Sequence, residues 1–176
     1  MPLKKGSEST SALQKVVPLS KAMPKPQFKV LVGVDWHNCL EVHGQVGFAN
    51  QQALQRLVHN DIGIVILSYI GQNSNVRRDL FYQEVLNLPM VSKFHKVADC
   101  KHKCGRGGKV ALYKDWGVST LFDDNKEICQ EGFGRGIQVF PITTKWESHQ
   151  WFFEEGFRPY HTFAIAAKAF LDSLGK

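Results

Sequence analysis

The chain has 176 residues, of which 43% are hydrophobic and 22% are charged. These values are ordinary for a globular protein and permit one domain with a buried core. No apolar run approaches the roughly 18 residues of a membrane-spanning helix, and the N-terminus lacks the apolar stretch of a signal peptide. The four cysteines are too scattered for a disulfide framework, so we expect an intracellular, cytoplasmic protein that does not enter a membrane.

Positive charge is concentrated at the start of the chain. The net charge is +6, and residues 1–29 hold six lysines and one acid, Glu8. Residues 1–27 are also rich in Ser and Pro and show little periodicity, so we predict a disordered basic tail there and a folded domain over 28–176. Such a tail either contacts nucleic acid and other anionic surfaces or is only a solvated leader.

From residue 28 onward, short apolar runs alternate with amphipathic segments. Apolar runs that stop at turn residues predict strands at 28–34, 64–67, 91–97, 119–122 and 136–141. Apolar residues at helical spacing predict helices at 50–59, 74–86, 109–115, 125–133 and 161–174. Residues 39–48 are typical of a small hairpin or flap, and the aromatic segment 146–160 is expected to be irregular.

Two of the predicted helices carry local signals at their starts. Asn50 suits the N-cap of the first helix, and Asn73 or Ser74 suits the N-cap of the second. Four apolar side chains of the second helix are expected to face inward: Val76, Leu80, Phe81 and Val85.

Strands that alternate with helices predict an α/β fold of the Rossmann-like kind, with three layers (α/β/α) and a mainly parallel sheet. In such a sheet the carboxyl ends of the strands lie along one edge, where ligands bind. Asp35 follows the first predicted strand, Ser68 the second, and Asp123 and Asp124 the fourth. We therefore expect these side chains to meet at one edge of the sheet.

Four features with a shared chemistry then follow one another along the chain. Asp35 can attack phosphorus and bind Mg²⁺, and the acidic pair Asp123-Asp124 can complete a magnesium site built from oxygen ligands. The hydroxyl of Ser68 can donate a hydrogen bond to a phosphate oxygen. Lys109, after a glycine-rich turn, can neutralise charge on phosphate. Together they predict a metal-assisted phosphoryl-transfer site.

This order resembles the haloacid dehalogenase-like hydrolase superfamily over residues 28–142, which is most of the predicted domain. Asp35 matches the position of the family's nucleophile, Ser68 its second motif and Lys109 its third. The segment 121–128, together with the strand that follows it, resembles the fourth motif.

The resemblance implies Mg²⁺-dependent hydrolysis of a phosphomonoester through an aspartyl-phosphate on Asp35. By analogy, Asp124 is the second metal ligand, Asp123 lies beside it, and the backbone carbonyl of His37 faces the metal. Only short inserts separate the motifs, so we expect no large cap domain. An open pocket of this kind suits a phosphorylated substrate, including a nucleotide or a nucleic acid.

The chain departs from the family pattern two residues after Asp35. Phosphatases of this family usually have a second aspartate there, as the general acid and base for the leaving group, and this chain has His37. Histidine exchanges protons near neutral pH and can take over that role. The same change is also consistent with a catalytically degenerate module that binds phosphate or a partner without turnover.

A different resemblance is carried by the same segment. Asp35-Trp36-His37-Asn38 is similar to the Asp-x-x-Asn start of NYN/PIN-like metal-dependent nucleases, which also use an α/β sheet with clustered acids. The position of Lys109 and the acidic pair before a helix favour the first family.

A cluster of possible zinc ligands lies between the second and fourth predicted motifs: His95, Cys100, His102 and Cys104. Zinc favours such ligands in tetrahedral sets, but the spacing is unusual and no second ligand pair follows. The alternative is a basic surface loop, since the same segment carries several lysines and leads to Lys109. A basic loop beside a phosphate pocket could attract a nucleotide or nucleic acid.

Aromatic residues gather near the end of the chain. They either stack bases or pack against the closing helix: Trp146, Trp151, Phe152, Phe153, Phe157 and Tyr160.

Overall fold

The computed structural model describes residues 28–176 apart from residue 73, so the predicted tail at 1–27 lies outside the described residues. The strands are β1 (Val30–Val34), β2 (Glu41–Val42), β3 (Gln45–Val46), β4 (Ile62–Tyr69), β5 (Lys96–Cys100), β6 (Thr120–Asp123) and β7 (Gln138–Pro141). The helices are α1 (Phe48–His59), α2 (Asn75–Leu86), α3 (Lys109–Asp115), α4 (Lys126–Gly134), α5 (Trp146–Glu154) and α6 (Phe163–Ser173), with a 3-10 turn, η1 (Val91–Lys93).

Five of the strands form one sheet in the order β5-β4-β1-β6-β7, and every neighbouring pair is parallel. The central strand β1 pairs on both sides, with Val32 opposite Ile64 of β4 and opposite Thr120 of β6. Both β1 and β4 are nearly continuous apolar runs, as expected for strands that are covered on both faces. The carboxyl ends of β1, β4 and β6 therefore lie together.

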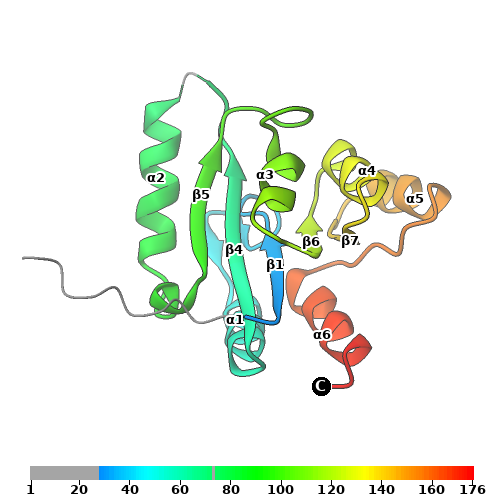
Figure 1. Ribbon diagram of the computed structural model, residues 1–176, viewed down its shortest axis with the longest axis horizontal. Helices are drawn as coiled ribbons and strands as arrows, with labels where there is room; N and C mark the ends of the chain where they lie inside the picture. Colours follow the sequence, from blue (N-terminus) through cyan, green and yellow to red (C-terminus); the bar gives the residue numbers. More distant parts are fainter. Residues whose placement is uncertain (1–27, 73) are drawn as a thin grey trace, which may run out of the picture.

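Helices lie on both sides of the sheet (Figure 1), and two clusters of buried side chains pack between them and the strands. One includes Leu54 of α1, Phe81 of α2 and Phe170 of α6. The other includes Tyr113 of α3 and Ile128 of α4. Helices thus cover both faces of a parallel sheet, which confirms the predicted three-layer α/β/α fold of the Rossmann-like kind.

Gly33 allows α3 to approach the central strand closely. A Cβ atom at this position would lie 2.5 Å from the ring of Tyr113, which is buried in the core. Because Tyr113 and Lys109 lie on the same short helix, the glycine also sets the depth at which Lys109 reaches the end of the sheet.

Several helix starts agree with the sequence, and one does not. Ser74 caps α2 by accepting a hydrogen bond from the Arg77 N–H, as predicted. Asn50, predicted as the N-cap of the first helix, lies inside α1, whose N-cap is Gly47. Its buried side chain instead donates to the carbonyl of Leu40 at 3.0 Å and accepts from the N–H of Ala164 at 3.1 Å. Asn50 therefore does not cap its own helix but connects it to two segments outside the helix.

The inward face of α2 is narrower than predicted. Phe81 and Val85 are buried, but Val76 is 81% exposed and Leu80 is 53% exposed. The reason is the position of α2 beside the edge strand β5 (Figure 1), where only one stripe of the helix meets the core.

Two segments have a different secondary structure from the one predicted. The expected strand at 91–97 begins with η1, and β5 starts only at Lys96, because buried Leu88 and Met90 hold the chain in a turn before it. The segment predicted to be irregular contains helix α5, which buries only Phe152 and so shows no apolar periodicity. The small hairpin predicted at 39–48 is confirmed by β2 and β3.

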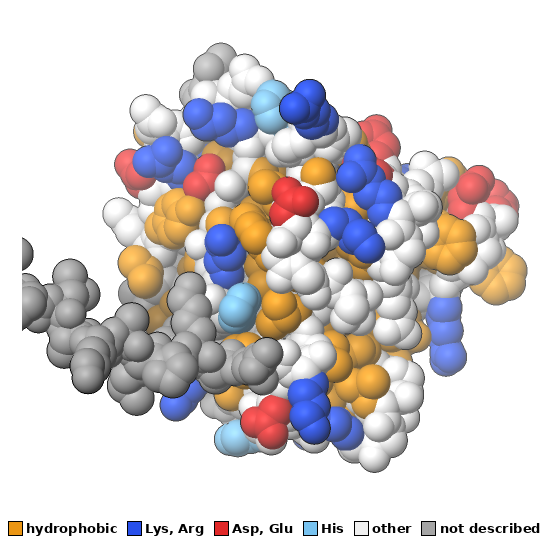
Figure 2. Space-filling view, viewed as in Figure 1, with side chains coloured by type: hydrophobic (Ala, Val, Ile, Leu, Met, Phe, Trp, Pro, Cys, Tyr) orange, Lys and Arg blue, Asp and Glu red, His pale blue; other side chains and the backbone are white. Residues whose placement is uncertain are grey.

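The segment between β5 and α3 forms a basic surface loop. Lys101 and Arg106 are exposed, and Lys103 pairs with Glu127 at 2.9 Å. Basic side chains gather over this loop at the top of the face in Figure 2. None of the helices in the described part of the chain has the length and apolar character that a membrane crossing requires.

Candidate active site

Asp35 begins the site at the carboxyl end of β1. Its backbone N–H donates to the carbonyl oxygen of Phe122 at 2.9 Å, which extends the pairing of β1 with β6 beyond the last strand residue. The side chain is only 10% exposed. A buried carboxylate in this position needs a charged or polar partner.

Asp123 and Asp124 reach the same point from the end of β6. One carboxylate oxygen from each of Asp35, Asp123 and Asp124 lies within 4.8 Å of the other two. Among the described residues, this is the one group of three or more possible metal ligands. The sheet thus brings together side chains that are far apart in sequence.

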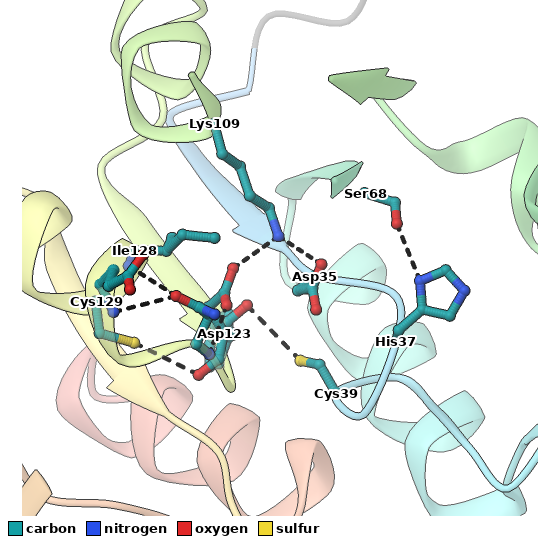
Figure 3. A network of polar contacts seen from close by, with 11 residues as sticks. Asp35, His37, Cys39, Ser68, Lys109, Asp123, Ile128 and Cys129 are labelled. Carbon is teal, nitrogen blue, oxygen red and sulfur yellow. Dashed lines mark hydrogen bonds and ion pairs between the residues drawn. The ribbon is translucent and has the colours of Figure 1, made fainter. Parts of the chain in front are cut away.

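Lys109 supplies the positive charge of the cluster (Figure 3). Its ammonium group donates to Asp35 and, at 2.7 Å, to Asp123, and its side chain is 1% exposed. Lys109 is the first residue of α3, as predicted, and Gly108 is the N-cap that turns the chain into the helix. Three ionised carboxylates and one ammonium leave a net charge of −2, which matches a divalent cation.

Burial and mutual charge set the pKa values in the cluster. Burial raises the pKa of Asp35 and raises that of Asp123 to about 6, although Lys109 opposes both shifts. Burial and the charge of Asp123 raise the pKa of Asp124 to about 6. Burial alone would lower the pKa of Lys109, but Asp123 and Asp35 together raise it well above its usual range.

The three carboxylates are not equivalent in their contacts. Asp123 uses both oxygens within the protein, one for Lys109 and the other for the backbone N–H of Asn125 at 2.9 Å. Asp124 accepts a hydrogen bond from the side chain of Asn38. Asn38 has a φ of 57°, in the left-handed region that asparagine tolerates better than most residues. The sequence pointed to Asn38 only through the nuclease resemblance, and its contact with Asp124 was not predicted because that contact depends on this backbone conformation.

His37 and Ser68 form a second polar contact beside the cluster. The Nδ1 of His37 and the Oγ of Ser68 are 3.2 Å apart, and Figure 3 shows the His37 ring turned toward Ser68 and away from Lys109. Ser68 is fully buried, whereas His37 is exposed. All six side chains predicted for the site therefore lie at one edge of the sheet, in two adjoining groups.

Two cysteines lie near the carboxylates and take no part in their charge balance. The thiol of Cys39 lies 3.7 Å from the carbonyl oxygen of Phe122, and that of Cys129 lies 3.6 Å from the carbonyl oxygen of Asp123. Burial, with the nearby carboxylates, raises the pKa of both thiols well above the usual range. They remain protonated and poorly nucleophilic.

The candidate zinc ligands do not join into a metal-binding group. Cys100 is buried in the core cluster beneath α3, while His102 is exposed. Within the described residues, no set of three of these side chains lies close enough to share an ion.

A cavity of about 670 Å³ opens beside the carboxylate cluster. Asp124 and Asn38 line it, together with residues of the β2–β3 hairpin. Lys145, from the segment after β7, and His161, from the approach to α6, line it as well. The site therefore has room for a ligand larger than phosphate.

Three solved structures share this architecture. The D,D-heptose 1,7-bisphosphate phosphatase from B. bronchiseptica, complexed with magnesium and phosphate, is 14% identical, with a TM-score of 0.60 over 82% of this chain and 99% of the other. The cobalt-bound deoxy-D-mannose-octulosonate 8-phosphate phosphatase from Haemophilus influenzae is 15% identical, with a TM-score of 0.53 over 83% and 89%. A haloacid dehalogenase-like family protein from Streptococcus pneumoniae is 13% identical, with a TM-score of 0.52 over 72% and 60%.

No protein-family model and no curated protein sequence matches the chain significantly. At identities near 14% the likeness to the solved structures shows the fold alone. This shared fold favours the resemblance to the haloacid dehalogenase-like hydrolases over the resemblance to the NYN/PIN-like nucleases.

Proposed function

Because this chain has the haloacid dehalogenase-like fold, we propose that it is a Mg²⁺-dependent phosphatase that acts through an aspartyl-phosphate on Asp35. One observation carries the proposal: Lys109 bridges Asp35 and Asp123 in a buried cluster that also contains Asp124. Two of the similar structures are metal-bound phosphatases of sugar phosphates, which agrees with a phosphorylated substrate.

The donor atoms of the cluster fit a magnesium ion. They are carboxylate oxygens, the ligand type that Mg²⁺ prefers, and their net charge with Lys109 is −2. Asp123 already uses both oxygens, so Asp35 and Asp124 are the side chains left to hold the ion, with the backbone carbonyl of His37 as the ligand that the resemblance implies. Bound Mg²⁺ neutralises developing charge on phosphoryl oxygens.

Asp35 is the nucleophile in the first step. Its carboxylate oxygen forms a bond to phosphorus while the bond from phosphorus to the leaving alcohol oxygen breaks. Protonated His37 gives its proton to that oxygen. The ammonium of Lys109 has three N–H donors, of which two are used by carboxylates, so the third can bind a phosphoryl oxygen.

His37 takes the opposite role in the second step. Neutral His37 accepts a proton from a water molecule, whose oxygen attacks phosphorus and breaks the bond to Asp35. Inorganic phosphate leaves, and both the Asp35 carboxylate and the protonated imidazole are restored. The contact between Nδ1 and Ser68 orients the ring, so Nε2 is the nitrogen available for proton exchange.

The nucleophile assignment is tested by Mg²⁺-dependent phosphate release from a broad panel of phosphate monoesters. Asp35→Asn should abolish release, because an amide cannot form the aspartyl-phosphate. Asp172→Asn is a matched control, since Asp172 is exposed and pairs only with Lys168 on α6. Equal activity of Asp35→Asn and wild type would refute the nucleophile role.

A second candidate function is a binding module without turnover. It is favoured by one observation: a histidine stands where phosphatases of this fold usually have an aspartate, and it contacts the buried hydroxyl of Ser68. His37→Asp separates the two functions. A gain in turnover from an inactive wild type supports the binding module, whereas a loss of existing turnover supports His37 as acid and base.

A further inference from the structure

We propose that the cavity beside the carboxylates binds the nucleoside part of a nucleoside monophosphate, whose base stacks on an aromatic column made of Trp146, His149 and His161. This inference names the substrate class of the proposed phosphatase and rests on that function. Three observations carry it: the geometry of the column, the cavity that His161 and Asp124 share and the polar groups that line it.

The aromatic column consists of three nearly parallel rings. The ring centroids of Trp146 and His149 are 6.2 Å apart at an interplanar angle of 1°, and those of His149 and His161 are 5.4 Å apart at 17°. His149 is the middle ring. Trp146 is 75% exposed and His161 is also exposed, so flat aromatic surface remains in solvent at both ends of the column. Parallel offset rings of this kind stack nucleobases.

One ring of the column, His161, and one carboxylate of the cluster, Asp124, line the same cavity. Lys145 and Ser148 also line the cavity, and they lie at the start of α5 beside the other two rings, Trp146 and His149. A carboxylate oxygen of Asp124 lies within 4.8 Å of one of Asp35. A phosphate bound at Asp35 would therefore lie beside the cavity in which a base stacks on His161.

Polar groups line the same cavity. Thr143, Thr144 and Ser148 supply hydroxyl groups, which can exchange hydrogen bonds with the hydroxyls of a ribose. Lys126 and Lys145 add positive charge, which favours an anionic nucleotide over a neutral nucleoside. The volume of about 670 Å³ falls within the range of about 300–1,000 Å³ that is usual for small-ligand sites.

A sugar phosphate without a base would use the hydroxyls and the lysines but would leave the column in water. The test therefore compares adenosine 5′-monophosphate with ribose 5-phosphate, which differs from it only by the base. With wild-type protein and Mg²⁺, kcat/KM should favour the nucleotide by about tenfold, since the stacking of one base is worth on the order of one to two powers of ten in affinity.

His161→Ala should reduce that preference to about one, and His161→Phe should retain it, because phenylalanine keeps the stacking surface without the imidazole nitrogens. Phe153→Ala is the matched control: Phe153 is 72% exposed on α5, the helix that carries Trp146 and His149, and is not part of the column. A preference that survives His161→Ala, or that falls equally in Phe153→Ala, overturns the inference.

Binding to the Asp35→Asn protein separates this inference from the proposed function. Titration calorimetry with adenosine 5′-monophosphate and Mg²⁺ needs no turnover. His161-dependent binding to this variant, together with no hydrolysis of any ester by the wild-type protein, supports the column and refutes the phosphatase. Hydrolysis of both esters at equal kcat/KM keeps the phosphatase and refutes the column. A 5′-phosphorylated oligonucleotide in the same assay identifies whether free nucleotides or strand ends are preferred.

Discussion

Replacement of Lys109 by Met tests whether the buried cluster is balanced as the structure indicates. The change keeps the length and apolar stem of the side chain but removes the one ammonium shared by Asp35 and Asp123. The three side chains are 1%, 10% and 1% exposed, in the order Lys109, Asp35, Asp123. Removal of one partner from a buried ion pair destabilises a protein by about 3–5 kcal/mol, and we expect that loss at pH 8.

Protonation sets an upper bound on the loss. An aspartate that avoids ionisation at pH 8 gives up about 1.4 kcal/mol for each unit between pH 8 and its usual pKa near 4, which is about 6 kcal/mol. Without Lys109, the pKa of Asp123 in the folded state should rise further above that of the unfolded chain. The folded state then binds more protons, so the loss should shrink as the pH falls from 8 toward 5.

The assay is urea unfolding of wild type and Lys109→Met at pH 8 and pH 5.5. Lys168→Met is the matched control, because Lys168 pairs with exposed Asp172 at 2.7 Å on the surface of α6 and its loss should cost about 0.5 kcal/mol or less. Addition of Asp123→Asn to Lys109→Met should recover much of the stability at pH 8. A loss for Lys109→Met under about 1 kcal/mol at pH 8, or one that is independent of pH, would refute the charge balance.

Three further predictions concern the same edge of the sheet. Gly33→Ala should lower the free energy of unfolding in urea by about 1–3 kcal/mol, because the new Cβ would lie 2.5 Å from the ring of Tyr113. Addition of Tyr113→Leu should reduce that loss. A loss of the same size in the double variant would contradict the close approach of α3 to β1. The pKa of Asp124, raised to about 6 mainly by burial, lies above its unfolded value, so this carboxyl makes the metal-free protein more stable as pH falls from 7 toward 4. Protons then compete with Mg²⁺, so the Mg²⁺-induced rise in Tm should be larger at pH 7.5 than at pH 5 and absent in Asp124→Asn; equal shifts would count against a metal site. Asn50→Ala should cost about 3 kcal/mol, because its buried side chain joins two backbone segments, whereas exposed Asn60→Ala should change unfolding little.

The sheet and the positions of the carboxylates could be predicted because they depend on local patterns. Continuous apolar runs mark β1 and β4 as buried strands, and a parallel sheet necessarily gathers the residues that follow its strands. Asp35 and Asp123 were therefore expected to lie near each other without any knowledge of their contacts. Lys109 was expected at a helix start because a glycine-rich turn precedes it.

The parts that could not be predicted depend on partners far away in the sequence. Asn50 has the local signature of an N-cap, but its side chain accepts from a backbone N–H 114 positions later. The contact between His149 and His161 joins α5 to the segment before α6, and no periodic pattern in the sequence predicts it. The different roles of Asp123 and Asp124 could not be predicted either, because the two adjacent aspartates are distinguished only by the hydrogen bonds of Asp123 to Lys109 and Asn125.

The ion pair between Lys109 and Asp35 joins residues 74 positions apart, and this separation bears on the kinetics of folding. The chain must close a long loop before the two groups can meet, and such contacts form late on a folding pathway. A divalent ion held by the completed cluster would then bind only after the rate-limiting barrier. It should slow unfolding in proportion to its binding and leave the refolding rate nearly unchanged. The lifetime of the native state would thus increase with the concentration of the metal ion, while the time needed to fold would stay nearly the same.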